Sequence, residues 1–216
     1  VIKEYNLHTF SLENSYSLPE GMQPLRVYAS KGRIYATTLG TNNLIIIDRD
    51  HGSSKVIRFT EGVPSTIMEY RDKLYVMLWS GGGTKNPSYL SEMDGNYGIV
   101  EVRDPITGEK YDEIRAGFEA HNFDINYKTG KLYAFNTGDG SVTIVNLNDH
   151  SKTKTLDVGT SVDALQTDGQ TLYINSRLGG SKIFAYQFDR RTLKQIKAGN
   201  WPTGIQISKR LQKLFV

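Results

Sequence analysis

The chain has 216 residues, of which 38% are hydrophobic and 23% charged, a composition typical of a folded globular protein rather than a disordered one. Its 26 basic and 23 acidic residues nearly balance, and no run of Lys and Arg exceeds two residues, which argues against a nucleic-acid partner. The absence of cysteine excludes disulfides, thiolate metal sites and covalently attached c-type haem.

A short apolar strand with an aromatic residue in second place recurs along the chain. The aromatic residues are Tyr35, Tyr75, Tyr133, Tyr173 and Phe215. Three of the four spacings between them are 40 to 42 residues, and the other, 58, contains an insertion of about 18 residues. Self-similarity at this period predicts an architecture built from one repeated unit.

Each unit continues in the same way after its aromatic residue. A Gly/Asn loop leads into a β-branched strand, then a polar turn, then a strand that ends in glycine. The β-branched strands are expected at Asn43–Asp48, Gly98–Asp104, Ser141–Asn146 and Lys182–Phe188, and the closing glycines are Gly62, Gly117, Gly159 and Gly199. Each unit thus holds four short strands in a meander, which predicts an all-β fold of the β-propeller type with four-stranded antiparallel blades.

The near-continuous apolar run from Leu44 to Ile47 suits a strand that is covered on both faces. Blades packed face to face around an axis supply that cover and leave only short sheet edges. A β-sandwich is the alternative, but a sandwich does not require the strand pattern to recur every 40 residues.

We expect a single propeller domain over residues 1–216, with full blades near 22–62, 63–117, 118–159 and 160–199 and half-blades at 1–21 and 200–216. Two readings of these units fit the pattern. Either the two half-blades join into one composite blade and close a five-bladed ring, or the chain is part of a ring of six to eight blades. The second reading is favoured because Val216 stands inside an apolar strand.

The repeat resembles the YVTN family, the lactonase-like propellers of bacteria and archaea. The matching segments are Asp168-Gly169, Leu172-Tyr173-Ile174-Asn175, Val102–Gly108 and the blade opening Asn200–Ile205. The segment Tyr35-Ala36-Thr37-Thr38 departs from the family pattern because it lacks the terminal Asn. The resemblance implies a periplasmic or cell-surface protein that acts as a binding module or as a partner of redox proteins, and it does not fix the chemistry.

In a propeller, the loops between second and third strands and the links between blades surround one mouth of the axial channel. The insertion lies at this channel-mouth face, between Ser80 and Tyr97, and carries Tyr89, Leu90 and Met93. Long loops on a rigid scaffold often carry function. The alternative is that its aromatic residues only pack the loop onto its own blade.

His121 opens an innermost strand next to the blade that carries the insertion. A histidine here suits a hydrogen-bond donor to a ligand, or a general base with a carboxylate such as Glu119 or Asp163. The alternative is a structural histidine. Trp79 and Trp201 fall at the same mouth, where rigid aromatic rings suit binding, although Trp201 equally suits a wedge between blades. The predicted ligand-binding residues are Trp79, Tyr89, Tyr97, Phe118, His121, Asn122, Arg177, Asn200 and Trp201.

No metal site and no cofactor are expected. A zinc site needs three or four ligands, and the remaining histidines lie on the opposite face or near a terminus. Asp48–Gly52 begins like a calcium loop, but the closing position falls on Phe59 instead of glutamate.

These patterns favour a non-catalytic binding or scaffolding propeller that engages a protein partner or a small-molecule ligand through the channel mouth, in the periplasm or outside the cell. One alternative is a lyase or hydrolase that uses His121. Another is a structural subunit of a larger redox or surface assembly. No apolar run approaches the roughly 18 residues that a membrane-spanning helix needs, so no transmembrane segment is expected in this chain.

Overall fold

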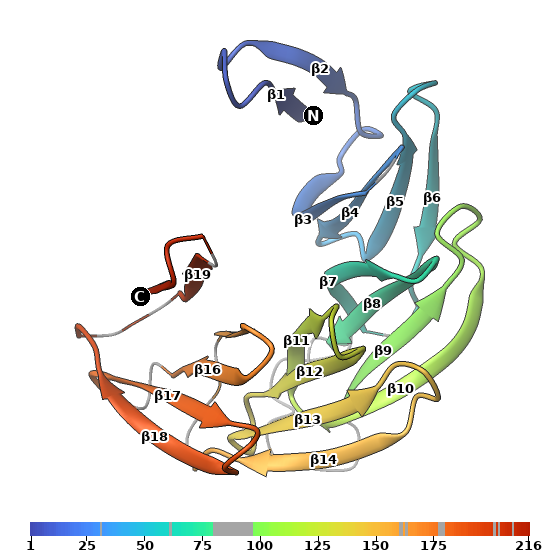
Figure 1. The fold of residues 1–216 in the computed structure, drawn as a ribbon. Helices are drawn as coiled ribbons and strands as arrows, with labels where there is room; N and C mark the ends of the chain where they lie inside the picture. Colours follow the sequence, from blue (N-terminus) through green and yellow to red (C-terminus); the bar gives the residue numbers. More distant parts are fainter. Residues whose placement is uncertain are drawn as a thin grey trace.

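A computed structural model of the protein describes residues 1–30, 32–60, 62–79, 97–159, 162, 164–176, 180–200, 202, 204–208 and 210–216. Within these ranges the chain forms strands and turns and no helix. The described residues therefore contain no helix that is long and apolar enough to cross a membrane. The strands form small sheets that fan out around a common centre (Figure 1), as the sequence predicts.

Four sheets have four antiparallel strands each, and within each sheet the strands pair in chain order. Sheet 1 contains β3 (Gln23–Ser30), β4 (Arg33–Leu39), β5 (Asn43–Asp48) and β6 (Ser54–Arg58). Sheet 2 contains β7 (Val63–Tyr70), β8 (Lys73–Trp79), β9 (Tyr97–Arg103) and β10 (Lys110–Phe118). Sheet 3 contains β11 (Ala120–Asn126), β12 (Lys131–Asn136), β13 (Ser141–Asn146) and β14 (Lys152–Asp157). Sheet 4 contains β15 (Ala164–Thr167), β16 (Thr171–Asn175), β17 (Lys182–Gln187) and β18 (Thr192–Lys197).

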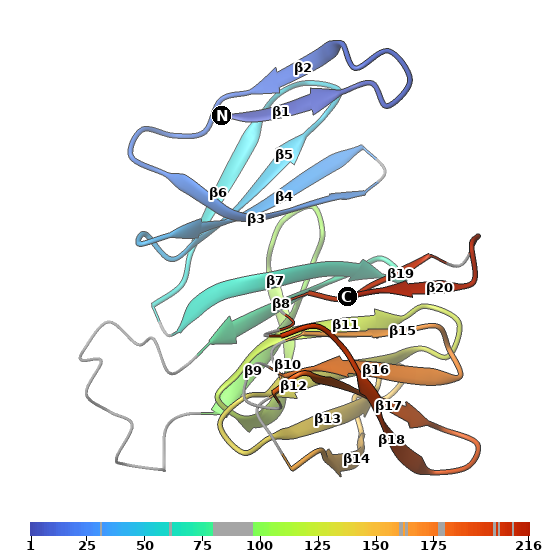
Figure 2. The same ribbon diagram turned by 90° about the vertical axis from the view of Figure 1, so that its left-hand side faces the viewer.

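Two short hairpins flank these sheets: β1 (Ile2–Tyr5) with β2 (Leu12–Tyr16), and β19 (Gln206–Ser208) with β20 (Lys213–Phe215). Among the described strands, each hairpin pairs only within itself. The sheets therefore form an open arc in which the two hairpins lie apart (Figure 1), and Figure 2 looks into the open side. One of the two readings of the sequence joins the terminal half-blades into a composite blade, and the described strands of the two hairpins do not pair with each other.

The third strand of each sheet is buried on both faces because neighbouring sheets cover it. In β5, Leu44 and Ile46 pack into the core between sheets 1 and 2, whereas Ile45 and Ile47 pack into the core shared with the β1–β2 hairpin. Alternate residues of a strand point to opposite faces, so a continuous apolar run serves two cores at once. This explains why Leu44 to Ile47 contains no polar residue.

The recurring tyrosines are wedges between neighbouring sheets. Tyr35, Tyr75 and Tyr133 are almost completely buried. The Tyr35 hydroxyl donates to Glu69 Oε2 of sheet 2 at 2.9 Å, and the Tyr75 ring meets His150 of sheet 3 edge-on at 6.1 Å between centroids. Burial raises the pKa of Tyr75 and of Tyr133 to about 12, so these phenols stay neutral. A repeated tyrosine therefore fixes the spacing between blades.

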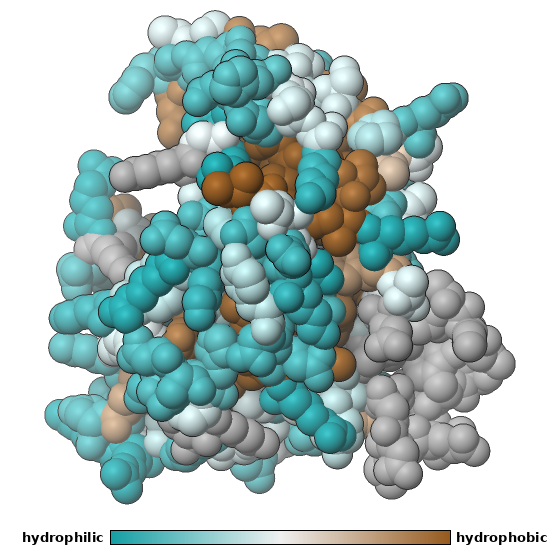
Figure 3. All heavy atoms as spheres, turned by 90° about the vertical axis from the view of Figure 1, so that its right-hand side faces the viewer, coloured by the Kyte–Doolittle hydropathy of each residue, from teal (hydrophilic) through white to brown (hydrophobic). Residues whose placement is uncertain are grey.

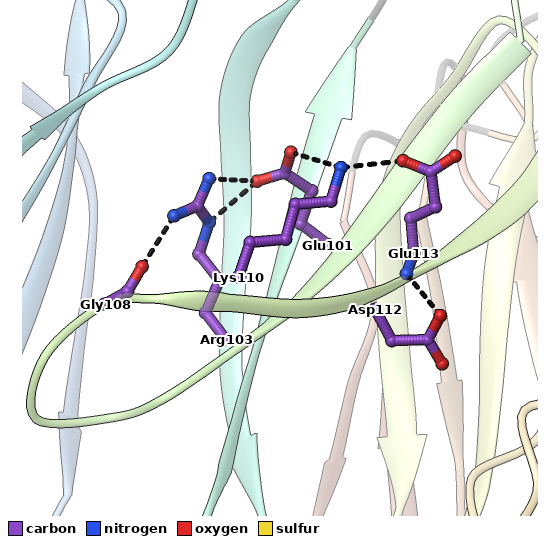
Figure 4. Close-up of polar contacts among 6 residues, drawn as sticks. All are labelled: Glu101, Arg103, Gly108, Lys110, Asp112 and Glu113. Atoms are coloured by element: carbon purple, nitrogen blue, oxygen red, sulfur yellow. Dashed lines mark hydrogen bonds and ion pairs between the residues drawn. The ribbon is translucent and has the colours of Figure 1, made fainter.

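A buried ion-pair network reinforces the face of sheet 2 that meets sheet 1 (Figure 4). The Arg103 guanidinium donates to Glu101 Oε2 from Nε at 2.7 Å, and to the carbonyl of Gly108 at 2.6 Å. Lys110 Nζ lies 3.3 Å from Glu101 Oε1. The guanidinium also stacks on Phe59, with its carbon 4.7 Å from the ring centroid. The network therefore pairs a buried carboxylate and links the two sheets.

Apolar side chains also gather on the outer side of the molecule, as Figure 3 shows. Ile106, in the turn between β9 and β10, is 59% exposed, and Val56 on β6 is partly exposed. The carbonyl of Pro105 in the same turn accepts a hydrogen bond from Tyr35 of sheet 1 at 3.2 Å. This turn thus bonds to the neighbouring sheet and leaves the Ile106 side chain exposed to solvent.

Candidate functional site

Four of the predicted binding residues come together on what we call the upper face, where β12 turns into β13 and β10 leads into β11. Trp79 ends β8, Tyr97 begins β9, Phe118 ends β10 and His121 stands at the start of β11. All four therefore lie at strand ends, where a sheet can present side chains to solvent without losing its ladder hydrogen bonds.

The link between sheets 2 and 3 is irregular at this point. The pairing register shifts between Arg115 and Phe118 on β10 and between Ala120 and Asn122 on β11. Between the two shifts, Glu119 has a φ of 51°, in the left-handed region that non-glycine residues seldom adopt. Bulges of this kind redirect side chains and are frequent next to binding sites. Here the first shift precedes His121, and the second encloses it.

Trp79 and His121 form an edge-on aromatic pair with ring centroids 6.4 Å apart. Trp79 is 38% exposed, while His121 is half-buried behind it. The pair joins sheet 2 to sheet 3. A large ring that is held in place yet partly exposed is the kind of side chain that supplies contact area at low entropic cost.

The His121 ring is fixed by hydrogen bonds on one side. Its Nδ1 lies 3.0 Å from Thr137 Oγ1 and 3.4 Å from the carbonyl oxygen of Glu119. The Thr137 hydroxyl donates to the carbonyl of Val162 at 2.9 Å. The contact of Glu119 with His121 thus runs through the main-chain oxygen of Glu119. The carboxylate of Asp163, the other acid-base partner considered, lies outside the described residues.

A second aromatic pair lies at the same end of sheet 2, where β9 begins and β10 ends. Tyr97 and Phe118 meet edge-on at 6.3 Å between centroids, and the Arg115 guanidinium carbon lies 3.9 Å from the Tyr97 centroid. Cation–π stacking of this geometry holds the tyrosine ring in one orientation. The upper face therefore presents Trp79, Tyr97 and Phe118 as a preorganised aromatic surface.

Asn136 supports this surface from below. It is fully buried at the end of β12, accepts a hydrogen bond from the Gly117 amide at 2.9 Å, and donates to Ser141 Oγ at 2.8 Å and Thr143 Oγ1 at 2.9 Å. A Cβ at Gly117 would lie 2.2 Å from Asn136 Nδ2, so only glycine allows this approach. Asn136 therefore ties β10 to β12 and β13.

Gly138 allows the turn after β12 to touch Phe118. Its amide donates to the Phe118 carbonyl at 3.2 Å, and a Cβ here would come within 2.2 Å of the Phe118 ring. The β12–β13 turn is thus pressed against the aromatic surface, which limits the movement of Phe118.

Asn122 and the main chain of His121 are held by sheet 2. The Ser65 hydroxyl donates to the His121 carbonyl at 2.5 Å, and the Thr66 hydroxyl donates to Asn122 Oδ1. Asn122 Oδ1 also accepts the Phe123 amide at 2.9 Å. Asn122 therefore serves the contact between sheets, whereas the sequence predicts a ligand contact for it.

No family model matches the chain, and no curated protein matches it in sequence. Solved structures do match it. One in the mitotic checkpoint complex has a TM-score of 0.74 at 13% identity, over 95% of this chain and 60% of that one. One in the nidogen/laminin complex has a TM-score of 0.66 at 13% identity, over 90% of this chain and 71% of that one.

A third similar structure is dihydro-heme d1 dehydrogenase NirN in complex with DHE, with a TM-score of 0.63 at 10% identity, over 90% of this chain and 41% of that one. These neighbours are β-propellers, and the sheets of this chain have the same four-stranded antiparallel form. The chain is a β-propeller. It spans less than two thirds of the first and third of these structures, and identities this low establish the propeller fold and nothing finer.

Other predicted residues of the propeller are placed differently or not described. Tyr89, Arg177 and Trp201 lie outside the described residues. Asn200 is exposed in the link after β18, where its Oδ1 accepts a hydrogen bond from Ser181 at 2.8 Å. The structure therefore brings together Trp79, Tyr97, Phe118 and His121. It places Asn122 in the contact between sheets 2 and 3, and Asn200 in a separate contact within sheet 4.

Two polar residues of this face of the propeller, Thr137 and Asn175, are not among the residues predicted from the sequence. Asn175 ends β16 and is fully buried, and neither of its side-chain polar atoms has a hydrogen-bond partner among the described residues. Such a group is unusual in a folded protein. In the part of the chain that the structure describes, no three His, Asp or Glu side chains are grouped closely enough to hold a metal ion.

Proposed function

We propose that this propeller is a non-catalytic binding or scaffolding protein that engages a protein or small ligand through its upper face. The observation that carries the proposal is the half-exposed Trp79, held edge-on against His121 at a junction between two sheets. Ring contacts and the buried Asn136 fix the surrounding surface before any ligand arrives. Preorganised aromatic side chains lower the entropic cost of binding.

The proposal has two further parts. The insertion between Trp79 and Tyr97 joins the surface as a capture loop, which its position in the sequence supports. The protein acts in the periplasm or outside the cell, which the resemblance of its repeat to YVTN propellers supports. Two similar propellers come from structures of assemblies, the mitotic checkpoint complex and the nidogen/laminin complex, and these favour a protein partner.

The test compares three immobilised proteins: the wild type, Trp79→Ala and the control Ile106→Ala. Ile106 is more exposed than Trp79 and lies on the outer side of the molecule, so both variants should keep the wild-type melting temperature. Binders retained from an extract of the native source are then identified. We expect one binder to be retained by the wild type and by Ile106→Ala, and to be lost at least about tenfold with Trp79→Ala.

Equal retention by Trp79→Ala would contradict the proposal. A fourth protein that lacks residues 85–94 tests the capture loop separately. We expect this deletion to abolish retention with little change in melting temperature. If the deletion variant retains the binder as well as the wild type does, the loop does not take part in binding. The proposal would then rest on the aromatic surface alone.

A further inference from the structure

A pocket of about 570 Å³ opens on the opposite side of the molecule, which we call the lower face. Three hairpin ends from consecutive units form it, those of β11–β12, β15–β16 and β19–β20, which lie together on the right in Figure 2. Its volume is in the range of small-molecule sites. Ile207 and Leu214 give it an apolar wall, and the rest of the lining is polar.

The charged side chains of the pocket are two lysines, Lys128 and Lys213, and one aspartate, Asp168. Asp168 serves its own turn: its Oδ1 accepts the amides of Gln170 at 2.8 Å and Thr171 at 2.7 Å, and its Oδ2 accepts the Tyr173 hydroxyl at 3.4 Å. No ion pair joins either lysine to another described residue. The lining therefore has excess positive charge that the turn does not neutralise.

The pocket also has hydrogen-bond donors besides its two lysines. Ser208 Oγ accepts the Leu211 amide at 3.3 Å, which leaves its hydroxyl hydrogen to donate. Behind the pocket, Asn126 is 6% exposed, and its Nδ2 has no hydrogen-bond partner of normal geometry among the described residues. Its nearest influence is on the Tyr133 phenol: burial raises the pKa of that phenol, and the Asn126 side chain lowers it slightly. Asn126 Oδ1 accepts the amides of Lys128 at 3.1 Å and Thr129 at 3.2 Å, which fixes the orientation of the side-chain amide.

The Asn126 donor points at the wall of the pocket. Its Nδ2 lies 3.6 Å from the position that a Cβ would occupy on Gly169, and Gly169 lines the pocket. Glycine leaves this side open, so an acceptor that enters beside Gly169 can approach the buried N–H. Two lysines, the Ser208 hydroxyl and the Asn126 amide donor lie around one pocket. All of these donors suit the same kind of ligand, an oxygen-rich anion.

We propose that the lower pocket binds a small organic anion, a carboxylate or a phosphate monoester. Lys128 and Lys213 hold its charge, and Ile207 and Leu214 receive its carbon skeleton. The lysine ammonium groups act as mobile point charges and do not impose a planar geometry, so both kinds of anion fit. The site is separate from the upper face and does not depend on the function proposed there.

The experiment is calorimetric titration of the intact chain with phenyl phosphate and with benzoate, and with benzyl alcohol as the neutral control. We expect saturable one-to-one binding of at least one anion, weakened by added salt because exposed charges are screened. Lys128→Gln and Lys213→Gln should each weaken binding by about tenfold, since each removes a charge-assisted contact. Lys55→Gln and Lys194→Gln, on the outer strands β6 and β18, should bind as the wild type does.

Four outcomes would overturn the proposal: no saturable binding of either anion, equal binding of benzyl alcohol, unchanged binding by both pocket variants, or an equal loss with Lys55→Gln. All of the lysines exchanged are on the surface, so melting temperatures confirm that the variants fold. Trp79→Ala should leave anion binding unchanged, which separates this site from the upper face.

Discussion

Thr137 Oγ1 lies 3.0 Å from His121 Nδ1 and donates its single hydrogen to the carbonyl of Val162. Because that hydrogen is used, the hydroxyl oxygen can only accept from Nδ1. The Glu119 carbonyl, 3.4 Å from the same nitrogen, is also an acceptor. Both contacts require a proton on Nδ1, so the neutral ring has Nε2 as its basic nitrogen.

We therefore expect long-range ¹H–¹⁵N correlation spectra of the neutral His121 ring to show the Nδ1–H tautomer. Thr137→Val removes one of the two acceptors, so it should shift the ring toward a mixture of tautomers and lower the free energy of unfolding by about 1–2 kcal/mol. A wild-type ring protonated on Nε2 would show that Thr137 donates to His121 instead.

Asn136 is the buried hub of the upper face, and we expect Asn136→Leu to lower the free energy of unfolding by about 2–4 kcal/mol. Leucine has a similar volume, but it leaves the Gly117 amide and the hydroxyls of Ser141 and Thr143 without their partner. Urea denaturation measures the change. A loss below about 1 kcal/mol would mean that these groups find other partners.

Asn175 predicts the opposite response to the same substitution. In the part of the chain that the structure describes, both of its side-chain polar atoms are buried without a partner. Asn175→Leu therefore removes a desolvation cost that no hydrogen bond offsets. The free energy of unfolding should rise by about 1 kcal/mol, or stay level if leucine packs less well. The comparison with Asn136→Leu controls for the chemistry of the exchange. A marked loss with Asn175→Leu would contradict the absence of a partner.

The regular part of the fold could be predicted from the sequence because one physical need repeats in every unit. A large aromatic side chain packs between each blade and its neighbour, and for this reason Tyr35, Tyr75 and Tyr133 recur along the sequence and are buried. Likewise, Asn43–Asp48 and Ser141–Asn146 are strands as predicted, because both segments are rich in the β-branched residues that suit a strand covered on both faces.

The contacts at the sites could not be predicted because they do not repeat. The position of His121 at the start of an inner strand follows from the repeat, but its contact with Thr137 depends on two register shifts and on the positive φ of Glu119. Asn126 shows the same limit on the lower face. In the sequence it is an ordinary turn-forming residue. Only the fold shows that its Nδ2 is buried without a hydrogen-bond partner among the described residues.

Arg103 pairs with Glu101 in the buried network of sheet 2, and we expect Arg103→Met to lower the free energy of unfolding by about 3 kcal/mol. The variant leaves the Glu101 carboxylate, which is almost fully buried, without its main partner. Lys110→Met should cost less than about 1 kcal/mol, because Lys110 is largely exposed. The double variant Glu101→Met/Arg103→Met should be more stable than Arg103→Met alone. Equal losses for the two single variants would contradict this account.

Asp104 makes the stability of the propeller depend on pH in the acid range. The Tyr111 hydroxyl donates to Asp104 Oδ2 at 2.5 Å, and the amides of Thr107 and Ile106 donate to Oδ1 at 2.6 and 2.7 Å. These bonds, the one from Tyr111 above all, lower the pKa of Asp104 from 3.8 to about 2. The unfolded chain therefore binds the proton more readily, and folding is favoured while the carboxylate stays charged.

The contribution of Asp104 should be complete above the unfolded pKa and should disappear as the pH falls from about 4 to about 2. Because the site is open to solvent, we expect less than about 1 kcal/mol. Urea denaturation at pH 6 and at pH 2.5 measures it, with Asp104→Asn as the variant that lacks this titration. Tyr111→Phe removes the strongest of the three bonds, so it should raise the pKa of Asp104. The free energies of unfolding measured at pH 6 and at pH 2.5 should then differ by less than they do in the wild type. If the wild type and Asp104→Asn lose stability equally between pH 6 and pH 2.5, the acid sensitivity must come from other carboxylates.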